Sequence, residues 1–375
     1  MGYDTIVVGA GIFGLSTANE LANRGQSVLL IDRFGSGHPA TSSTGASRSI
    51  RVAYDHPFYV ELAQEAIESW HRLERASGKK ILHLTGQVDL GDESKLRDLV
   101  RTVHAAGAEI EVLDAGAVRR YFPELVLAAG EIALFQKQAG TVLADVAMTA
   151  LLEATQNAGV VYVAPERAMQ IDFGPVVTVH TDRQHHEASQ VVVAAGPWAK
   201  ELLSGIGIDL PLSPAVAQVT FLDAPGLVER PGIAEWSPNG GAGYYGHPVP
   251  GIGYKIAYDA GMSGWHPDVE EWGTVPEEER QLLQWLGKRM PGVPHKITKT
   301  QRHPWTMTPD VDFIVDRKDR LIVAGGCSGH AFKFGPALGR MVADIVEGGA
   351  APQLTRLDRP ALARAAPSPS LPISR

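Results

Sequence analysis

Residues 4–32, with the sequence DTIVVGAGIFGLSTANELANRGQSVLLID, restrict the fold of this chain more than any other segment. A short β-branched run leads into three glycines spaced G-x-G-x-x-G, and a helical pattern follows the glycines. A second apolar run then ends at an acidic residue. A strand, a glycine turn, a helix, a strand and an acid in this order predict the βαβ unit that binds a dinucleotide.

Each conspicuous residue of this motif has a physical role. Gly9 allows a tight turn, Gly11 lets the backbone approach a pyrophosphate, and Gly14 allows the helix to pack closely against the first strand. The helix begins near Ile12, so its free N–H groups and positive dipole would face the phosphates. Asp32 would accept hydrogen bonds from ribose hydroxyls. This acid argues against a 2′-phosphate but does not separate FAD from NAD.

Composition narrows the class of protein. With 375 residues the chain is too long for one ordinary core, so two domains are expected. A net charge of −8 argues against nucleic acid or an anionic membrane surface as a partner. Cys327 is the one cysteine, so disulfides within the chain are excluded and no metal site is expected. The chain has no apolar run of membrane-spanning length and no room for a signal peptide, so we expect a cytoplasmic enzyme.

The rest of the sequence predicts an α/β fold, in which a Rossmann-like domain is joined to a second domain built on an antiparallel sheet. The parallel sheet is expected to contain residues 5–8, 28–31, 191–195 and 321–324. The dinucleotide domain is expected to be discontinuous, with residues 1–83, 140–212 and 306–375. The second domain takes residues 84–139 and 213–305.

Four further segments carry specific expectations. Residues 82–90 are expected to form one strand, and residues 276–289 an amphipathic helix. Residues 302–312 are expected to form a loop that leads to a strand at 313–315. The tail, residues 365–375, is rich in proline and serine and is expected to be disordered.

With these elements placed, the chain resembles the monomeric sarcosine oxidase and N-methyltryptophan oxidase family of flavoproteins over nearly its whole length. The segments that carry the resemblance are IVVGAGIFGLSTANELANRG, GASRSIRVAY, YYGHPVPGIGYKIAY, and TMTPDVDFIVD through AGGCSGHAFKFGPALG. The resemblance implies a glutathione-reductase-type FAD fold with FAD bound in an extended form. It also implies oxidation of the C–N bond of an N-substituted amino acid to an imine, with electrons passing to O2 to give hydrogen peroxide. We expect a monomer.

The resemblance also assigns roles around the substrate. Arg51 and Lys333 fall where the family holds the substrate carboxylate, and two fixed cations suit that role. Arg48 falls on an arginine close to the flavin. Lys255 falls on the lysine that faces the flavin ring and helps oxygen react, and Tyr245 falls on an active-site tyrosine. The alternative for each charged residue is an ordinary position facing solvent.

The nucleotide motif and the resemblance together give a set of cofactor-binding residues. Besides the β-strand and helix ends at 4–32, it draws on the serine-rich loop, on the AAGPW turn and on the last glycine-rich turn. The expected contacts are Gly9, Gly11, Ile12, Gly14, Asp32, Arg33, Ser43, Ser47, Arg48, Gly196, Trp198, His303, Gly326, Gly329, His330, Phe332 and Lys333.

His303 marks the first departure from the family pattern. The family usually tethers its flavin through a cysteine, and here His303 occupies that position. Cys327 lies too far along the chain to be a simple substitute. Non-covalent FAD is therefore favoured, and a histidyl bond at His303 remains an alternative.

Asp259 marks the second departure, because sarcosine oxidases carry a histidine there, beside the substrate amine. A carboxylate favours the protonated amine, whereas oxidation needs the neutral amine, so Asp259 weighs against sarcosine itself. Fructosyl amino acid oxidases, which are relatives of this family, have an acid at the comparable place. Asp259 therefore indicates a substrate with hydroxyls or a positive group, unless its side chain faces solvent.

Other classes of protein remain open at this stage. A nicotinamide-dependent dehydrogenase would share the first 32 residues but should lack the segment around Lys333. A non-catalytic flavoprotein would bind FAD without being reduced by a substrate. An FAD-dependent amino acid dehydrogenase with another electron acceptor is the nearest rival, and Lys255 is the feature against it.

Overall fold

The βαβ unit forms the centre of an eight-stranded sheet. A computed structural model describes residues 2–236, 243–259, 262–263, 267–268 and 273–363. In it, β1 (Tyr3–Val8) leads into α1 (Ile12–Asn23), and β2 (Val28–Ile31) pairs parallel with β1. The tail at 365–375 lies outside the described residues.

The expected parallel sheet is confirmed. On its other side β1 pairs parallel with β12 (His185–Val193), which pairs parallel with β20 (Leu321–Gly325). The other strands of this sheet are β9 (Val161–Val163), β10 (Ala168–Phe173), β11 (Val177–Thr181) and β19 (Ile314–Lys318).

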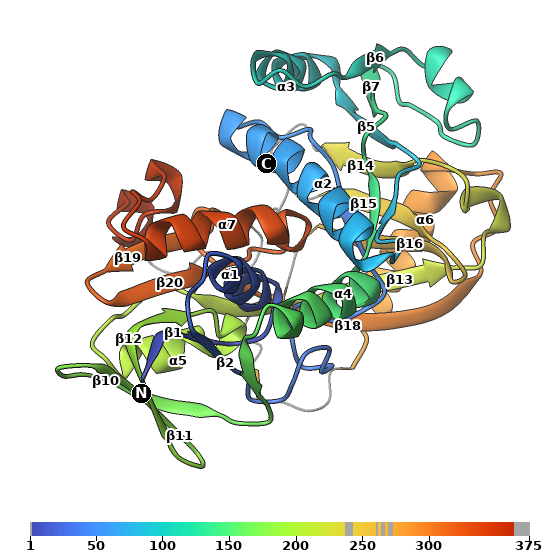
Figure 1. Ribbon diagram of the computed structural model, residues 1–375. Coiled ribbons are helices and arrows are strands. Elements are labelled where there is room, and N and C mark those ends of the chain that lie inside the picture. Colours follow the sequence, from blue (N-terminus) through green and yellow to red (C-terminus); the bar gives the residue numbers. More distant parts are fainter. Residues whose placement is uncertain (1, 237–242, 260–261, 264–266, 269–272, 364–375) are drawn as a thin grey trace.

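Helices cover both faces of this sheet, because its strands carry apolar side chains on both faces. One face packs against α1, α4 (Ala144–Asn157) and α7 (Gly335–Val346), which lie side by side in Figure 1. Gly339 permits this, because a Cβ there would lie 2.5 Å from the backbone of Ser16 in α1. The opposite face packs against α5 (Ala199–Ser204).

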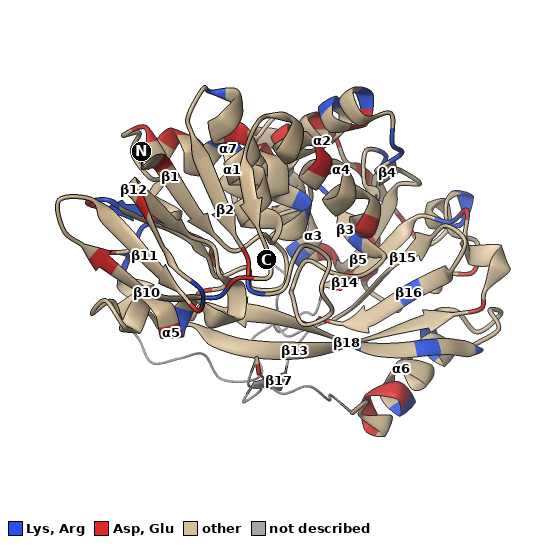
Figure 2. Cartoon of the chain, turned by 60° about the horizontal axis from the view of Figure 1, so that its bottom comes forward, with Lys and Arg blue, Asp and Glu red and all other residues tan. Residues whose placement is uncertain are grey.

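A second, nine-stranded sheet carries the other half of the molecule. Its strands are β5 (Gln87–Asp92), β6 (Glu111–Leu113), β7 (Glu131–Gln136), β13 (Ser213–Leu222), β14 (Gly232–Trp236), β15 (Tyr244–Val249), β16 (Gly253–Tyr258), β17 (Met262–Ser263) and β18 (Ile297–Met307). Every pairing is antiparallel except that of β14 with β5, so the sheet is mixed rather than wholly antiparallel. Figure 2 shows the long strands β13 and β18 running side by side along this half.

Three short strands and three helices complete the description. The strands β3 (Ser47–Ile50), β4 (Leu82–His83) and β8 (Gly140–Leu143) form a small antiparallel sheet. The helices are α2 (Pro57–Ser77), α3 (Glu93–Ala105) and α6 (Pro276–Arg289), of which the last matches its predicted bounds. None of the helices in the described ranges is both long and apolar enough to cross a membrane.

Two local expectations are wrong. Residues 82–90 form two strands in different sheets, because Gly86 has a φ of +84° and turns the chain between them. The expected loop that contains His303 is instead the end of β18, where Ala217 pairs with His303. The prediction failed here because Pro304 suggests the end of a strand. Among the described strands β18 pairs with β13 alone, so it is an edge strand, in which the missing N–H of a proline is tolerated.

Candidate active site

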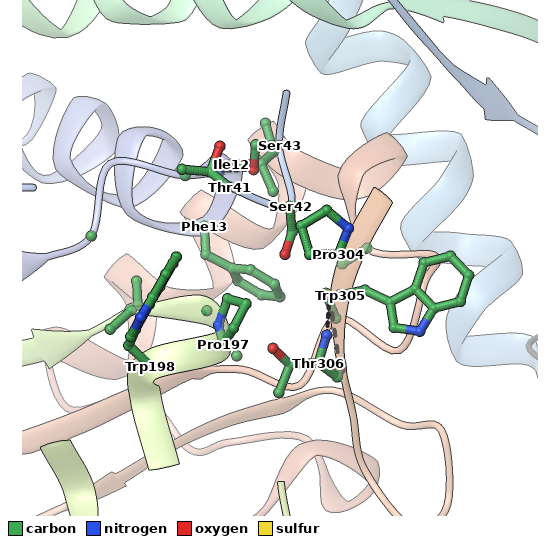
Figure 3. A pocket seen from close by; sticks show the side chains of 18 of the residues that line it. Ile12, Phe13, Thr41, Ser42, Ser43, Pro197, Trp198, Pro304, Trp305 and Thr306 are labelled. Atoms are coloured by element: carbon green, nitrogen blue, oxygen red, sulfur yellow. Dashed lines mark hydrogen bonds between the residues drawn. The ribbon is translucent and has the colours of Figure 1, made fainter. Parts of the chain in front are cut away.

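A deep cavity opens where the glycine turn meets the ends of β12, β18 and β20. It is lined by the start of α1, the serine-rich loop, the AAGPW turn and the last glycine-rich turn. Figure 3 shows Phe13, Pro197 and Trp198 on one side of it and Pro304 and Thr306 on the other. We call this the nucleotide cavity.

The glycines of the motif have the close contacts that their predicted roles require. A Cβ on Gly14 would lie 1.7 Å from the carbonyl oxygen of Gly9, so only glycine allows α1 to approach the turn. Gly9 itself has a φ of +107°, and a Cβ there would lie 2.4 Å from the oxygen of Ala194. Gly11 and Ile12, at the start of α1, both line the cavity, and the N–H of Ile12 donates a 2.9 Å hydrogen bond to Ser43 Oγ.

Asp32 lies at the end of β2 and lines the same cavity, but its carboxylate also supports the loop. Oδ2 accepts a hydrogen bond of 2.6 Å from the N–H of Ala10, and Oδ1 accepts from the N–H groups of Phe34 and Gly35. A carboxylate has about four acceptor positions, so it can hold this loop and also bind a ribose hydroxyl.

The cavity fits FAD by the chemistry of its lining. Four of the residues that line it have a buried polar side-chain atom with no hydrogen-bond partner among the described residues: Ser42 Oγ, His303 Nδ1, Trp305 Nε1 and Thr306 Oγ1. Buried polar groups are normally paired, so these atoms fit a long polar ligand. The helix N-terminus and Asp32 at one end, and buried cations at the other, fit a dinucleotide whose ring end becomes anionic.

A second cavity adjoins the first. It holds Arg51, Asp259, His330 and Lys333, and we call it the substrate cavity. The residues that line both cavities are Arg48, Tyr245, Lys255, Gly329 and Phe332. A reaction between a molecule in one cavity and a molecule in the other would therefore take place beside these side chains.

Strand geometry explains why residues from one hairpin meet there. His247 on β15 pairs with Lys255 on β16, and directly opposed residues share a face of the sheet. Residues two positions along a strand share that face too, which adds Tyr245. Asp259 follows β16 at the same alternation and lines the substrate cavity, so the alternative that it faces bulk solvent is not supported.

Four cations line the substrate cavity: Arg51, Lys255 and Lys333 are buried, and Arg48 is half-buried. Lys255 Nζ donates a 3.0 Å hydrogen bond to the carbonyl of Ser47, and Lys333 Nζ donates a 3.0 Å hydrogen bond to the carbonyl of His330. Burial lowers the pKa of each lysine well below its usual value; Arg48 lowers that of Lys255 further, and Arg51 that of Lys333. A bound anion would relieve this repulsion, so the lining favours a ligand with a carboxylate.

Tyrosines and an acid surround these cations. Burial raises the pKa of Tyr54 to about 12, although the nearby Arg51 opposes the rise. Burial also raises the pKa of Tyr245, and the negative charge of Asp259 adds to that rise. Both phenols are therefore neutral donors at physiological pH. The charge of Asp259 acts on Lys333 in the opposite direction and partly restores its pKa.

His303 and Cys327 lie closer together than their sequence positions suggest. Both line the nucleotide cavity, and Cys327 Sγ accepts a hydrogen bond from the N–H of Thr306 at 3.3 Å. Burial and the neighbouring Arg48 lower the pKa of His303 well below its usual value, so the ring is neutral. Gln301 Nε2 lies 2.6 Å from its Nε2.

The structure divides the predicted cofactor residues into groups. The nucleotide cavity is lined by Gly9, Gly11, Ile12, Asp32, Arg33, Ser43, Arg48, Gly196, Trp198, His303, Gly326, Gly329 and Phe332. Gly14 and Ser47 line neither cavity: one packs against the turn, and the other binds Lys255 through its carbonyl. His330 and Lys333 line the substrate cavity alone.

Sequence reasoning missed several residues of the site. His247 is fully buried, with Nε2 3.1 Å from Ser47 Oγ, and its place two residues after Tyr245 on a strand was the available signal. Gln87, Trp236 and Tyr244 also line the substrate cavity. Gln87 and Trp236 come from β5 and β14, which pair over a long sequence separation, so no local pattern marks them. Tyr244 directly precedes the predicted Tyr245 on β15.

Comparison with known proteins decides the family. A model described as FAD dependent oxidoreductase (DAO) matches residues 4–345. The chain belongs to this family. It is 31% identical to the peroxisomal sarcosine oxidase of Mus musculus over 361 residues, which cover 92% of each chain. The monomeric sarcosine oxidase of Bacillus sp. (strain B-0618) is 29% identical, again over 92% of each chain.

A solved structure extends the likeness to three dimensions. NikD, described as an unusual amino acid oxidase essential for nikkomycin biosynthesis, superposes with a TM-score of 0.81 at 25% identity. The match covers 100% of this chain and 99% of NikD. The expected FAD fold and the resemblance to sarcosine oxidases are thus confirmed, and FAD rather than NAD is the cofactor.

Proposed function

We propose that this protein oxidises the C–N bond of amino acids that carry a substituent on nitrogen, and that it uses non-covalently bound FAD and passes the electrons to O2. The paired cations Arg51 and Lys333, beside a boundary shared with the nucleotide cavity, are the observation that carries the proposal. The names of the sarcosine oxidases to which the chain is similar support the same reaction class.

In this proposal the protein orients the substrate by charge. Arg51 and Lys333 bind the carboxylate, which leaves the amine and the adjacent carbon at the boundary near Tyr245 and Phe332. These rings exclude water, and a neutral amine is favoured there because the surrounding cations repel an ammonium group. Bound FAD supplies the two-electron oxidation.

Lys255 and Arg48 serve the second half of the reaction. Both lie at the boundary, so either positive charge can stabilise negative charge that develops on oxygen. Lys255 is the better placed of the two for a separate role, because among the described residues its ammonium group donates one hydrogen bond, to the carbonyl of Ser47, whereas Arg48 donates to three backbone carbonyls.

Asp259 favours a substrate larger than sarcosine. A methyl group cannot bond to a carboxylate, whereas a hydroxylated or positively charged substituent can. A fructosyl amino acid is the second candidate substrate on this ground. The position of Asp259 on the lining of the substrate cavity supports a hydroxylated substituent and a positively charged one alike.

The remaining expectations stay proposals. We propose a monomer that acts in the cytoplasm, in keeping with the monomeric sarcosine oxidase to which the chain is similar. The discontinuous domain boundaries stay a prediction as well. What supports them is that the strands of the nine-stranded sheet fall within 84–139 and 213–305, apart from the last two residues of β18.

The test is a substrate panel assayed in two ways. Sarcosine, other N-methyl amino acids, proline and fructosyl glycine are each mixed with the purified yellow protein without oxygen, and bleaching of the flavin is recorded. Peroxide release is then measured in air. Bleaching by no secondary amino acid would overturn the proposal, and bleaching without peroxide would point to a dehydrogenase with another acceptor.

A further inference from the structure

Asp89 on β5 is a buried carboxylate outside the predicted site. It is 0% exposed, and three side chains donate hydrogen bonds to it. Trp236 Nε1 donates to Oδ1 at 2.9 Å, Gln87 Nε2 donates to Oδ1 at 3.1 Å, and Gln136 Nε2 donates to Oδ2. No sequence motif marks this residue, and the oxidation reaction does not use it directly.

The surroundings of Asp89 require a group that only accepts hydrogen bonds. An indole N–H can only donate. The amide of Gln136 cannot reverse, because its oxygen already accepts from the N–H groups of Val52 at 2.8 Å and Ala53 at 2.9 Å. A protonated Asp89 would add a donor where its neighbours also donate. Burial raises the pKa of Asp89, but Arg51 and the three donors oppose that rise, and the geometry fits the ionised form.

Asp89 and two of its three partners lie beside Arg51. Asp89 Oδ1 lies 3.9 Å from Arg51 NH1, and the Trp236 ring, held by Asp89, lies 5.2 Å from the guanidinium carbon. Gln136 holds the backbone that follows Arg51, and Arg51 NH1 donates to the carbonyl of Ala53 at 2.8 Å. Asp89 thus links the nine-stranded sheet to both the side chain and the backbone of this arginine.

We infer that Asp89 is a positioning residue, which holds Arg51 in the orientation that binds the carboxylate of the substrate. The inference rests on the proposed function, since it takes Arg51 as a carboxylate-binding residue. Arg51 would otherwise have other carbonyls and acids within reach of its long side chain. With Asp89 in place, the guanidinium is fixed before the ligand arrives, so less conformational entropy is lost on binding.

The experiment uses two ligands that cannot be oxidised. Methoxyacetate resembles sarcosine with oxygen in place of nitrogen, and methoxyacetamide is its uncharged counterpart. Each is titrated into the FAD-loaded enzyme, and the change in the flavin absorbance gives the Kd. Asp89→Asn should weaken the binding of methoxyacetate by roughly tenfold or more and that of methoxyacetamide by less than about twofold. The reason is that the NH2 group of the asparagine cannot accept the hydrogen bonds that Asp89 accepts, so the link to Arg51 is broken. A general loosening of the fold would weaken both ligands equally and would overturn the inference.

A matched control and a second variant complete the test. Glu131 lies on β7, the strand of Gln136, and its carboxylate binds Arg289 of α6. Glu131→Gln removes this carboxylate and should leave both Kd values unchanged. If Asp89→Asn does not fold, Trp236→Phe removes one donor and keeps a ring over Arg51. It should weaken methoxyacetate about threefold with little effect on the amide. Equal Kd values for the variant and the wild type would overturn the inference.

Arg51→Ala separates this inference from the proposed function. A wild-type enzyme that binds acid and amide equally well, and an Arg51→Ala variant that binds them as the wild type does, would overturn the carboxylate role itself. Weaker binding of the acid in Arg51→Ala together with unchanged binding in Asp89→Asn would overturn the positioning role alone. In the double variant, Asp89→Asn should add nothing to the effect of Arg51→Ala, because its action passes through that side chain.

Discussion

The two adjoining cavities are built in different ways. The nucleotide cavity depends on backbone: glycines without side chains, a helix N-terminus and turns at the ends of parallel strands. The substrate cavity depends on single polar and charged side chains, which lie on β3, β15 and β16, directly after β3 and β16, and in the turn before α7. A change in the first should therefore affect folding and FAD together, whereas a change in the second should affect the reaction alone.

The charged groups of the two cavities also differ in how well their surroundings stabilise them. At the nucleotide end Asp32 accepts hydrogen bonds from three backbone N–H groups, so its charge is stabilised before any ligand binds. Around the substrate cavity the cations repel each other, and burial works against their charge. This second region is poised for an anion and costs stability until one binds. Single substitutions in either cavity test this difference.

The largest effect is expected in the nucleotide cavity. Gly14→Ala places a methyl group 1.7 Å from the carbonyl oxygen of Gly9, and that backbone atom cannot move without displacing the turn. We expect protein without FAD, measured as the ratio of flavin absorbance to protein absorbance. Gly287→Ala in α6 is the control, because nothing lies within 4 Å of its Cβ, and it should bind FAD as the wild type does. A yellow Gly14→Ala protein would show that the turn can adjust.

The next effect concerns oxygen. Lys255→Met should slow reoxidation of the reduced flavin by O2 roughly 100-fold, in line with the loss of one preorganised charge, and should change the KM little. In the wild type the reoxidation rate should fall as pH rises, and because burial lowers the pKa of Lys255, it should fall at a lower pH than for an ordinary lysine. Lys255→Met should lack this pH dependence. Stopped-flow mixing with oxygen measures both.

The nucleotide half of this molecule could be predicted from sequence, because its determinants are local. Gly9, Gly11, Gly14 and Asp32 lie in one continuous segment, and their spacing is required by one backbone geometry. The start of α1 and the parallel pairing followed from periodicity and from runs of β-branched residues, as did the bounds of α6 in the other half of the molecule. The prediction failed at Gly86 and at Pro304, where tertiary pairing outweighed the local signal.

The substrate half could be predicted only where the family resemblance supplied positions. Arg51, Lys333 and Lys255 came from that resemblance, and the structure brings them together. Asp89 and His247 did not, because their significance depends on which strand lies beside which. A buried carboxylate becomes visible as an arginine partner only after β5 is placed against β14 and β7.

A smaller effect should follow from the carboxylate site. Lys333→Met should raise the KM of an amino acid substrate by roughly tenfold to 100-fold, because one charge-assisted contact is lost, and it should leave the FAD content unchanged. Steady-state kinetics with the best substrate of the panel measures this. Lys288→Met, an exposed lysine near the end of α6, is the control. A loss of FAD from Lys333→Met that accompanies the rise in KM would contradict the separation of the two cavities.

Substrate preference should respond to Asp259. Asp259→His should shift the ratio of kcat/KM between fructosyl glycine and sarcosine by about tenfold toward sarcosine, because it removes the acceptor for hydroxyl groups. The ratio is informative because a general loss of activity cancels in it. If sarcosine is already the best substrate of the wild type and the ratio does not move, Asp259 does not contribute to specificity.

The smallest effect is expected at His303, which lines the nucleotide cavity. The neutral ring has Nδ1 without a partner among the described residues, so it can donate one hydrogen bond to the bound cofactor. A single such bond is worth about 1 kcal/mol, and His303→Ala should therefore raise the Kd of FAD by only a few fold. Acid denaturation should release yellow FAD into the supernatant from both proteins. Colour that stays with the wild-type pellet and leaves the pellet of His303→Ala would instead establish a histidyl bond, and the nucleotide cavity would then hold its cofactor by a covalent side-chain link as well as by its backbone.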